Sequence, residues 1–290
     1  RNLGGTLKRL VARAGEPVIR QAVITAMRIL GKQFVMGRNI HEALERARSA
    51  EKAGYRHSYD MLGESARSSA DALRYFESYR AAIRAIGDAA AGRPAYEAPS
   101  ISIKLSALHP RYEVANEDRV RHELWPVVKE LALRAKARNI GFTIDAEEVD
   151  RLEMSLDLIE ALATDAELAG WNGLGLAVQA YQKRALPLID WLTDLAHRAD
   201  RRLMVRLCKG AYWDAEIKLA QERGLRDYPV FTRKASSDLS YLACARRLFA
   251  HPEAFYPAFA THNAHTLAAV AEIAISAGGS DEWEYQRLHG

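Results

Sequence analysis

The sequence predicts an α/β fold of the (βα)8 TIM-barrel type, truncated after its seventh strand and preceded by an N-terminal helical arm. Two patterns lead to this prediction. From residue 55 onward, short apolar runs alternate with amphipathic segments of helical periodicity, which is typical of a parallel sheet covered by helices. The apolar runs also lack a polar face, as expected of strands buried on both sides. A closed barrel has eight strands in about 250 residues, so seven runs suggest an incomplete one.

The first 50 residues are expected to form a helical arm, and residues 51–290 the barrel domain without its eighth strand and helix. Apolar residues recur at largely helical spacing over residues 16–30. Gly31 follows directly and is expected to end this helix.

The remaining elements follow in order along the chain. Asn39 can cap a helix, Ile40–Lys52, which Gly54 should end. Strands are predicted at residues 56–62, 101–108, 141–145, 174–181, 203–207, 256–261 and 285–289. Helices are predicted between them at residues 66–86, 117–137, 148–163, 184–199, 214–223, 236–250 and 266–277. A doubly wound open sheet is the alternative, but no glycine-rich dinucleotide motif follows the first strand.

The composition bears on three properties of the protein: nucleic-acid binding, disulfide formation and membrane insertion. The chain carries 41 Lys and Arg against 37 Asp and Glu, a net charge of +4 that is too mild to indicate nucleic-acid binding. Cys208 and Cys244 form no spaced pair, so both are expected to be free thiols in a reducing compartment. No apolar run reaches the length of about 18 residues that a membrane span needs.

Polar and ionisable residues gather where the predicted strands end. Active sites of such barrels lie at the carboxyl ends of the strands, so we expect a functional rim there. Its members are Asp60, Glu64, Lys104, Asp145, Glu147, Glu148, Gln179, Tyr181, Arg206, Lys209, Tyr212, Trp213, Thr261, His262, Asn263, Leu288 and His289.

Arg206 is the most unusual of these residues because it interrupts the apolar run 203–207. A cation in a buried strand is costly unless it has an anionic or electron-rich partner. Arg206 could pair with the carboxylate of a neighbouring strand and stabilise the barrel, or it could act in an active site. This stretch alone leaves both interpretations open.

The rim residues allow three kinds of chemistry. Lys104 could form a Schiff base, as in barrel aldolases. A metal-dependent hydrolase could use Asp145, Glu147, His262 and His289. A large planar, phosphate-bearing cofactor could be lined by Gln179, Arg206, Lys209, Tyr212, Trp213, Thr232, His262 and Asn263. The residues alone leave these three open, together with a non-enzymatic scaffold.

Six long runs closely resemble the proline dehydrogenase domain of the bacterial proline utilization A (PutA) flavoenzymes, and the similarity extends from about residue 15 to residue 290. They occur in the same order as in that family. The runs are residues 59–64 (YDMLGE), 101–112 (ISIKLSALHPRY), 144–148 (IDAEE), 179–184 (QAYQKR), 206–213 (RLCKGAYW) and 259–266 (FATHNAHT).

The resemblance implies a barrel that binds FAD without a Rossmann domain and oxidises L-proline to Δ1-pyrroline-5-carboxylate, the first step of proline catabolism to glutamate. A hydride would pass from proline C5 to flavin N5, and the electrons would pass to a membrane quinone. It further implies a cytoplasmic protein in peripheral contact with the membrane, a homo-oligomer, and a bifunctional parent chain with a C-terminal aldehyde dehydrogenase module. In this segment the family's N-terminal DNA-binding module and its C-terminal aldehyde dehydrogenase module are expected to be absent, and no nucleic-acid partner is expected. The resemblance implies no metal site.

The resemblance also implies roles for single residues. Arg206 would lie beside flavin N5 and act in catalysis with Lys104 and Asp145. Lys104 would meet the substrate carboxylate, Asp145 would shape the proline pocket, Leu288 would pack on the proline ring, and Glu64 would gate the site. The implied flavin contacts are Gln179, Arg206, Lys209, Gly210, Tyr212, Trp213, Thr232, Thr261, His262 and Asn263.

One part of the family pattern is missing from the sequence. The paired arginines that grip the proline carboxylate, and a nearby tyrosine, come from the eighth helix and the strand before it. No residues follow Gly290 here, so one partner of the Glu64 gate is missing too. We therefore expect this exact fragment to bind proline weakly.

Overall fold

A computed structural model describes residues 15–17, 19–27, 31, 34–278 and 281–289. Its contacts divide the chain into two units, residues 1–53 with 288–290, and residues 54–287. In the first unit, residues 19–27 are helical, and α2 spans Ile40–Lys52. Asn39 caps α2 as predicted, by accepting a hydrogen bond from the backbone N–H of Glu42.

The second unit is built on a seven-stranded sheet in which every neighbouring pair is parallel and the strands follow their order in the chain. This confirms the predicted α/β class and the number of strands. The strands are β1 (Ser58–Asp60), β2 (Ser100–Ile103), β3 (Phe142–Ile144), β4 (Leu174–Gln179), β5 (Leu203–Cys208), β6 (Phe255–Ala260) and β7 (Glu284–Gln286).

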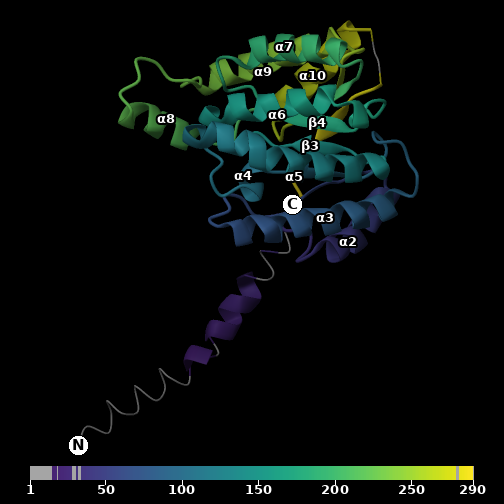
Figure 1. Ribbon diagram of the computed structural model, residues 1–290, viewed down its shortest axis with the longest axis vertical. Coiled ribbons are helices and arrows are strands. Elements are labelled where there is room, and N and C mark those ends of the chain that lie inside the picture. Colours follow the sequence, from purple (N-terminus) through teal and green to yellow (C-terminus); the bar gives the residue numbers. More distant parts are fainter. Residues whose placement is uncertain (1–14, 18, 28–30, 32–33, 279–280, 290) are drawn as a thin grey trace, which may run out of the picture. The chain divides into compact units, whose positions relative to one another are not determined.

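Helices connect the strands, and successive helices pack against one another outside the sheet (Figure 1). They are α3 (Ser69–Ala90), α4 (Leu105–Leu108), α5 (Glu117–Ala137), α6 (Leu152–Thr164), α7 (Ala185–Arg198), α8 (Trp213–Glu222), α9 (Lys234–Phe249) and α10 (Ala264–Ser276). Short 3-10 turns precede α5 and α6 and follow α6, at Val114–Asn116, Val149–Arg151 and Ala166–Leu168.

The sheet is rolled into an open barrel. Strands β1 and β5 are not neighbours in the sheet, yet the Arg206 side chain on β5 donates a hydrogen bond to Ser58 on β1, and another to Gln286 on β7. Such contacts across the sheet require that its inner face be concave. Every residue of β2, β3 and β4 is buried, as predicted for strands covered on both faces.

Most observed element boundaries differ from the predicted ones by a few residues, and three differences affect the assignment itself. The run 101–108 was expected to be one strand, but β2 ends at Ile103 and the helical turn α4 begins at Leu105. A short apolar run fits a buried strand and a buried helical turn equally well, so periodicity could not separate them. The last strand is Glu284–Gln286 rather than 285–289. Gly31, expected to end the first helix, is itself helical.

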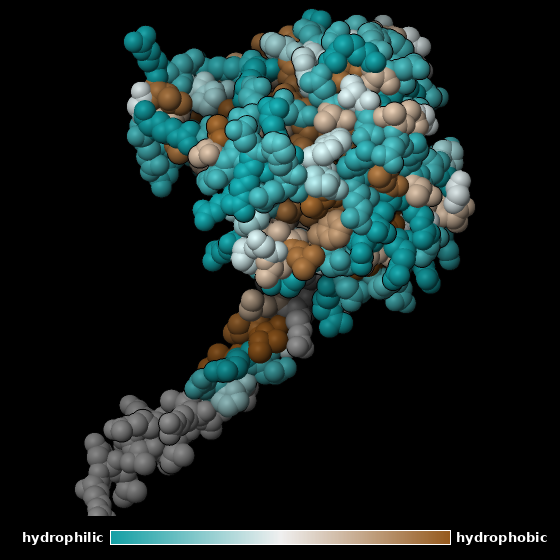
Figure 2. Space-filling view, viewed as in Figure 1, coloured by the Kyte–Doolittle hydropathy of each residue, from teal (hydrophilic) through white to brown (hydrophobic). Residues whose placement is uncertain are grey.

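The surface is mostly hydrophilic, as expected from the proportion of charged residues (Figure 2). Figure 2 shows a largely hydrophilic face over the barrel unit, interrupted by smaller apolar areas. Within the described part of the chain, no helix combines the length and the apolar character needed to cross a bilayer.

Candidate active site

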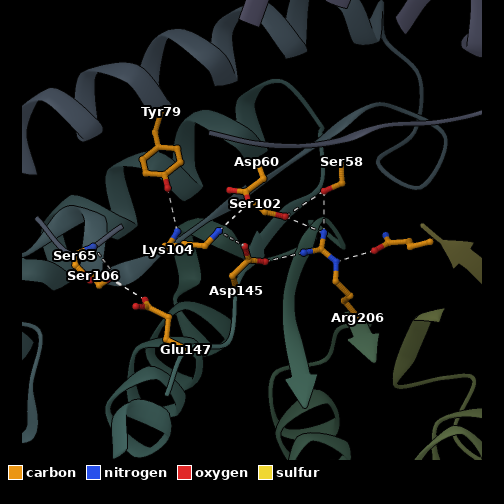
Figure 3. Close-up of polar contacts among 11 residues, drawn as sticks. Ser58, Asp60, Ser65, Tyr79, Ser102, Lys104, Ser106, Asp145, Glu147 and Arg206 are labelled. Carbon is orange, nitrogen blue, oxygen red and sulfur yellow. Dashed lines mark hydrogen bonds and ion pairs between the residues drawn. The ribbon is translucent and has the colours of Figure 1, made fainter. Parts of the chain in front are cut away.

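Arg206 occupies the inside of the barrel and is held by four side chains. Its Nε donates to Gln286 Oε1 at 2.7 Å, and one terminal nitrogen donates to Asp145 Oδ1 at 2.7 Å. The other terminal nitrogen donates to Ser58 Oγ at 2.9 Å and to Ser102 Oγ at 2.8 Å (Figure 3). The predicted partner for this cation therefore exists, and it is the carboxylate of Asp145.

Small neighbours make room for this guanidinium. In the sheet register Arg206 lies beside Ala177 on β4 and Ala258 on β6. Barrel interiors are usually filled by bulky branched side chains, which would collide with an arginine at this level. The alanines leave space and the serines add acceptors, so this layer of the barrel is built around a cation.

Lys104 continues the same network at the carboxyl end of β2. Its Nζ lies 2.8 Å from Asp60 Oδ2 and 3.0 Å from Asp145 Oδ2, so Asp145 bridges Lys104 and Arg206 through its two oxygens (Figure 3). The backbone N–H of Lys104 donates to the hydroxyl of Tyr79, a buried residue of α3. Chain segments far apart in sequence thus converge on one ionic cluster.

The cluster keeps Lys104 charged. Burial alone would lower the pKa of Lys104, but the carboxylates of Asp145 and Asp60 outweigh burial and raise it above its usual value. Burial raises the pKa of Asp60, and the hydrogen bond from Lys104 opposes that shift without reversing it. A Schiff-base lysine needs a lowered pKa to present a neutral amine, so this environment opposes the aldolase interpretation.

We accordingly expect Lys104 to resist trapping. Incubation with small aldehydes or ketones and borohydride at neutral pH should leave Lys104 unmodified by peptide mass analysis, because its ammonium form has no free electron pair to attack a carbonyl. Exposed lysines such as Lys218 serve as the internal reference for nonspecific labelling. Selective, stoichiometric labelling of Lys104 would restore the aldolase interpretation.

Glu147 and Gln179 brace the loops around the cluster. Glu147 is buried, and its Oε1 accepts the backbone N–H of Ser106 at 3.0 Å while its Oε2 lies 2.7 Å from Arg151. Burial raises the pKa of Glu147, which its hydrogen bonds and Arg151 only partly offset. Gln179 donates to the backbone carbonyl of Glu147 and accepts from the backbone N–H of Ala211. Both polar ends of Gln179 are therefore used between loops.

Gly210 shapes the turn after β5. Its φ of +145° lies in the region that favours glycine, and a Cβ there would stand 2.4 Å from the Tyr181 ring. The Tyr181 backbone N–H also donates to the carbonyl of Lys209 at 2.7 Å. The backbone at this turn consequently packs against an aromatic ring more closely than any other residue would allow.

Lys209 forms a second polar cluster at the ends of β5 and β6. Its Nζ pairs with Asp238 on α9 and donates to Thr266 Oγ1 at 3.1 Å. Asn263 caps α10 by accepting from the backbone N–H of Thr266 at 2.9 Å. The backbone N–H of Asn263 in turn donates to Thr261 Oγ1. Three of the predicted cofactor residues thus meet in one network.

The outer members of the rim are more exposed. Trp213 opens α8, is 42% exposed, and donates from its indole nitrogen to the carbonyl of Phe231, which precedes the exposed Thr232. His262 is also exposed. Tyr212 is half-buried; burial, followed by the charge of Glu64, raises its pKa.

Glu64 lies in an anchored loop. Glu64 itself is exposed, and the next residue, Ser65, donates its backbone N–H to Ser106 Oγ at 3.0 Å. Ala66 likewise donates its backbone N–H to the carbonyl of Ser106. Leu288 follows β7, is 77% exposed and groups with the first unit.

Sequence reasoning missed four residues of this site, namely Ser58, Tyr79, Ser102 and Gln286. Ser102 could have been found, because it lies two residues before Lys104 and strand alternation places both side chains on the same face. Ser58 and Gln286 carried no such signal, because only the rolled sheet brings their strands to Arg206.

The fold and the site together define a class. A parallel α/β barrel with lysine, arginine and carboxylates clustered at the carboxyl ends of its strands is the arrangement of a barrel enzyme. A family model described as proline dehydrogenase matches residues 43–290. The chain belongs to the proline dehydrogenase family, as the resemblance predicted.

The similar proteins found by comparison are PutA proteins. The bifunctional protein PutA of Salmonella typhimurium is 57% identical over 289 residues, which is 100% of this chain and 22% of that protein. A solved PutA structure from Bradyrhizobium japonicum is 56% identical, with a TM-score of 0.83 over 97% of this chain and 28% of that one. PutA from Bdellovibrio bacteriovorus, solved after inactivation by N-propargylglycine, is 27% identical with a TM-score of 0.88, covering 94% of this chain and 30% of that one. The chain thus spans about a fifth of the curated relative's length.

A second family model corrects one expectation. Residues 1–34 match a model described as the DNA-binding domain of proline dehydrogenase. The prediction that this family module is absent from the chain is therefore wrong.

Proposed function

We propose that this chain is the proline dehydrogenase barrel of a bifunctional PutA-type enzyme, which oxidises L-proline to Δ1-pyrroline-5-carboxylate with FAD as cofactor. The observation that carries the proposal is the ionic cluster in which Asp145 bridges Lys104 and Arg206 at the carboxyl ends of the strands of a proline dehydrogenase family barrel. In this proposal Lys104 binds the substrate, and Arg206 lies beside the cofactor.

Lys104 is the residue that binds the substrate carboxylate. Its side chain is 16% exposed, so the ammonium can reach a ligand at the rim, and Asp60 and Asp145 keep it protonated. Proline offers a carboxylate for this ammonium at one end of a small apolar ring. The relative from Bdellovibrio is inactivated by N-propargylglycine, which is also an amino acid with a substituted amine.

Asp145 fixes the positions of both cations, and thereby the distance between the carboxylate site at Lys104 and the guanidinium of Arg206. Leu288 is proposed to pack on the proline ring, and Glu64 to gate access from its anchored loop. The buried Glu147 and Gln179 side chains hold the adjoining loops in position by hydrogen bonds to their backbone.

The rim residues fit a flavin dinucleotide. Gly210 has no side chain, so a ligand can approach the backbone closely at the end of β5. Trp213 offers an exposed aromatic surface. Thr261, His262 and Asn263 directly precede α10, and the Lys209 ammonium donates to Thr266 in its first turn, so hydrogen-bonding groups gather at the start of this helix. Helix N-termini favour phosphate. Thr232, which precedes α9, is proposed as a further cofactor contact. Bound there, FAD supplies the acceptor for the hydride that leaves proline C5. The guanidinium of Arg206 provides fixed positive charge for the negative charge that develops on reduction.

The wider context is proposed from the resemblance. Electrons would pass to a membrane quinone through peripheral contact with the bilayer, and the parent chain would form a homo-oligomer with a C-terminal aldehyde dehydrogenase module. The relatives named bifunctional, of which this chain spans 22%, support the second module.

An absorbance spectrum of the full-length protein tests the function. We expect a flavin band in the visible region that L-proline bleaches without oxygen, because the hydride leaves the substrate in the absence of any other acceptor. Glycine, which retains the amino and carboxyl groups but lacks the ring, is the matched control and should leave the band intact. A colourless protein carrying one zinc ion per chain would refute the proposal and favour the hydrolase interpretation.

A further inference from the structure

We propose that Gln286, oriented by Glu284, is a positioning residue that fixes the Arg206 guanidinium for reduction of the cofactor. The inference rests on the proposed function and deepens it, because it concerns how one residue of that site is held. Neither Gln286 nor Glu284 contacts the cluster around Lys104, so their role is separable from that of the substrate residues.

The contact lies at a distinct place on the guanidinium. Gln286 Oε1 accepts from Nε, the nitrogen closest to the chain, whereas Asp145, Ser58 and Ser102 accept from the two terminal nitrogens. The terminal contacts hold the outer edge of the plane. The contact at Nε holds its inner edge, and together they prevent rotation of the plane about the end of the side chain.

The Gln286 amide has its orientation set by a neighbour. Its Nε2 donates to Glu284 Oε1 at 2.6 Å, which leaves its carbonyl oxygen to face Arg206. The two residues are two apart on β7 and therefore lie on the same face of the strand. A carboxylate cannot accept from an amide oxygen, so Glu284 excludes the flipped amide, which would turn a donor toward the Arg206 donor.

Glu284 is itself held by Arg56, which precedes β1, and by Tyr256 on β6. Its Oε2 lies 3.7 Å from an Arg56 guanidinium nitrogen and accepts the Tyr256 hydroxyl at 3.4 Å. A polar chain thus runs through the barrel from Arg56 and Tyr256 by way of Glu284 and Gln286 to Arg206. Glu284 and Gln286, the two half-buried residues of β7, therefore connect Arg56 and Tyr256 to the Arg206 guanidinium.

The consequence is a specific kinetic signature. Without the acceptor at Nε, the guanidinium retains its charge and its contact with Asp145 but is free to tilt, so its field at the cofactor is misdirected. Lys104 keeps its own partners, and proline binding is unaffected. Loss of the contact should therefore lower the rate of cofactor reduction without changing the affinity for proline.

The test compares Gln286→Met with Tyr285→Phe in the full-length flavin-loaded protein. Tyr285→Phe loses the hydrogen bond that the Tyr285 hydroxyl donates to the Leu267 carbonyl at 2.6 Å, and Gln286→Met loses its contacts with Arg206 and Glu284. Both variants thus lose side-chain hydrogen bonding on β7, but only Gln286 faces Arg206. Gln286→Met should slow flavin reduction by saturating proline by about tenfold to a hundredfold, the effect of one lost charge-assisted hydrogen bond. It should also move the flavin midpoint potential to a more negative value, with the Kd of proline unchanged. Glu284→Gln should shift both quantities in the same direction.

Equal reduction rates and equal midpoint potentials in Gln286→Met, Tyr285→Phe and wild type would overturn the inference. If Gln286→Met does not fold, the same comparison holds for Glu284→Gln, which keeps its size, and unchanged values there would overturn it as well. A wild-type protein that proline fails to reduce would instead refute the proposed function, and the inference with it.

Discussion

Replacing Arg206 with Met is expected to slow reduction of the flavin by L-proline by about a hundredfold or more, the range seen when a preorganised charge is removed from an active site. Methionine keeps the length of the side chain but provides neither charge nor donors. The four partners lose their shared donor, although Asp145 retains Lys104, so we also expect a loss of about 2–3 kcal/mol of unfolding free energy. Anaerobic stopped-flow absorbance and urea denaturation measure the two effects separately.

Arg202 offers a matched control for this experiment. It directly precedes the strand that carries Arg206, its side chain is 18% exposed against 17% for Arg206, and it pairs with Glu282 and the carbonyl of Phe255. Arg202→Met should cost similar stability and leave flavin reduction near the wild-type rate. Comparable losses of reduction rate in both variants would show that Arg206 acts only through the fold.

Replacing Asp145 with Asn should disturb both Lys104, proposed to bind the substrate, and Arg206, proposed to lie beside the cofactor. An amide can accept from one cation only and presents its NH2 group to the other, so either Lys104 or Arg206 loses its contact with residue 145. Breaking one side of a buried ionic cluster costs about 3 kcal/mol. The pKa of Lys104 should fall toward its usual value, because the charge of Asp145 is the largest single cause that raises it. We expect proline turnover to drop by at least about a hundredfold, measured by steady-state reduction of a dye acceptor.

Asp165 is the control for this change. Its carboxylate is 12% exposed against 14% for Asp145, and it also pairs with a lysine, Lys129, at 2.7 Å. Because it begins the 3-10 turn after α6, outside the rim, Asp165→Asn should lower stability while turnover persists. Full turnover in the Asp145→Asn enzyme would contradict the role assigned to the cluster.

Periodicity was enough to predict most of the fold. The alternation of buried runs with amphipathic segments places a strand or a helix by local pattern alone, and the burial of β2 to β4 on both faces agrees with it. The run 101–108 shows the limit of this reasoning. Its apolar residues continue past Ile103, so nothing local marks the point where the chain turns into α4.

The site was predictable where a charge interrupts an apolar strand. Lys104 and Arg206 stand out in that way, and a cation in such a position requires a partner, which Asp145 provides. Ser58 and Gln286 did not stand out, because a small hydroxyl and an amide at a strand are ordinary residues. Their significance depends on the curvature of the sheet, which no local pattern encodes.

The sequence separation between Arg206 and its partners has a consequence for folding. Arg206 is separated from Ser58 by 148 residues and from Gln286 by 80, so its contacts close some of the longest loops in the chain. Contacts between distant segments are entropically expensive and form late in folding. A partly folded intermediate can hold local helices and neighbouring strands while the arginine remains unsatisfied. The full set of four Arg206 contacts therefore requires the complete sheet, because Ser58 lies on its first strand and Gln286 on its seventh.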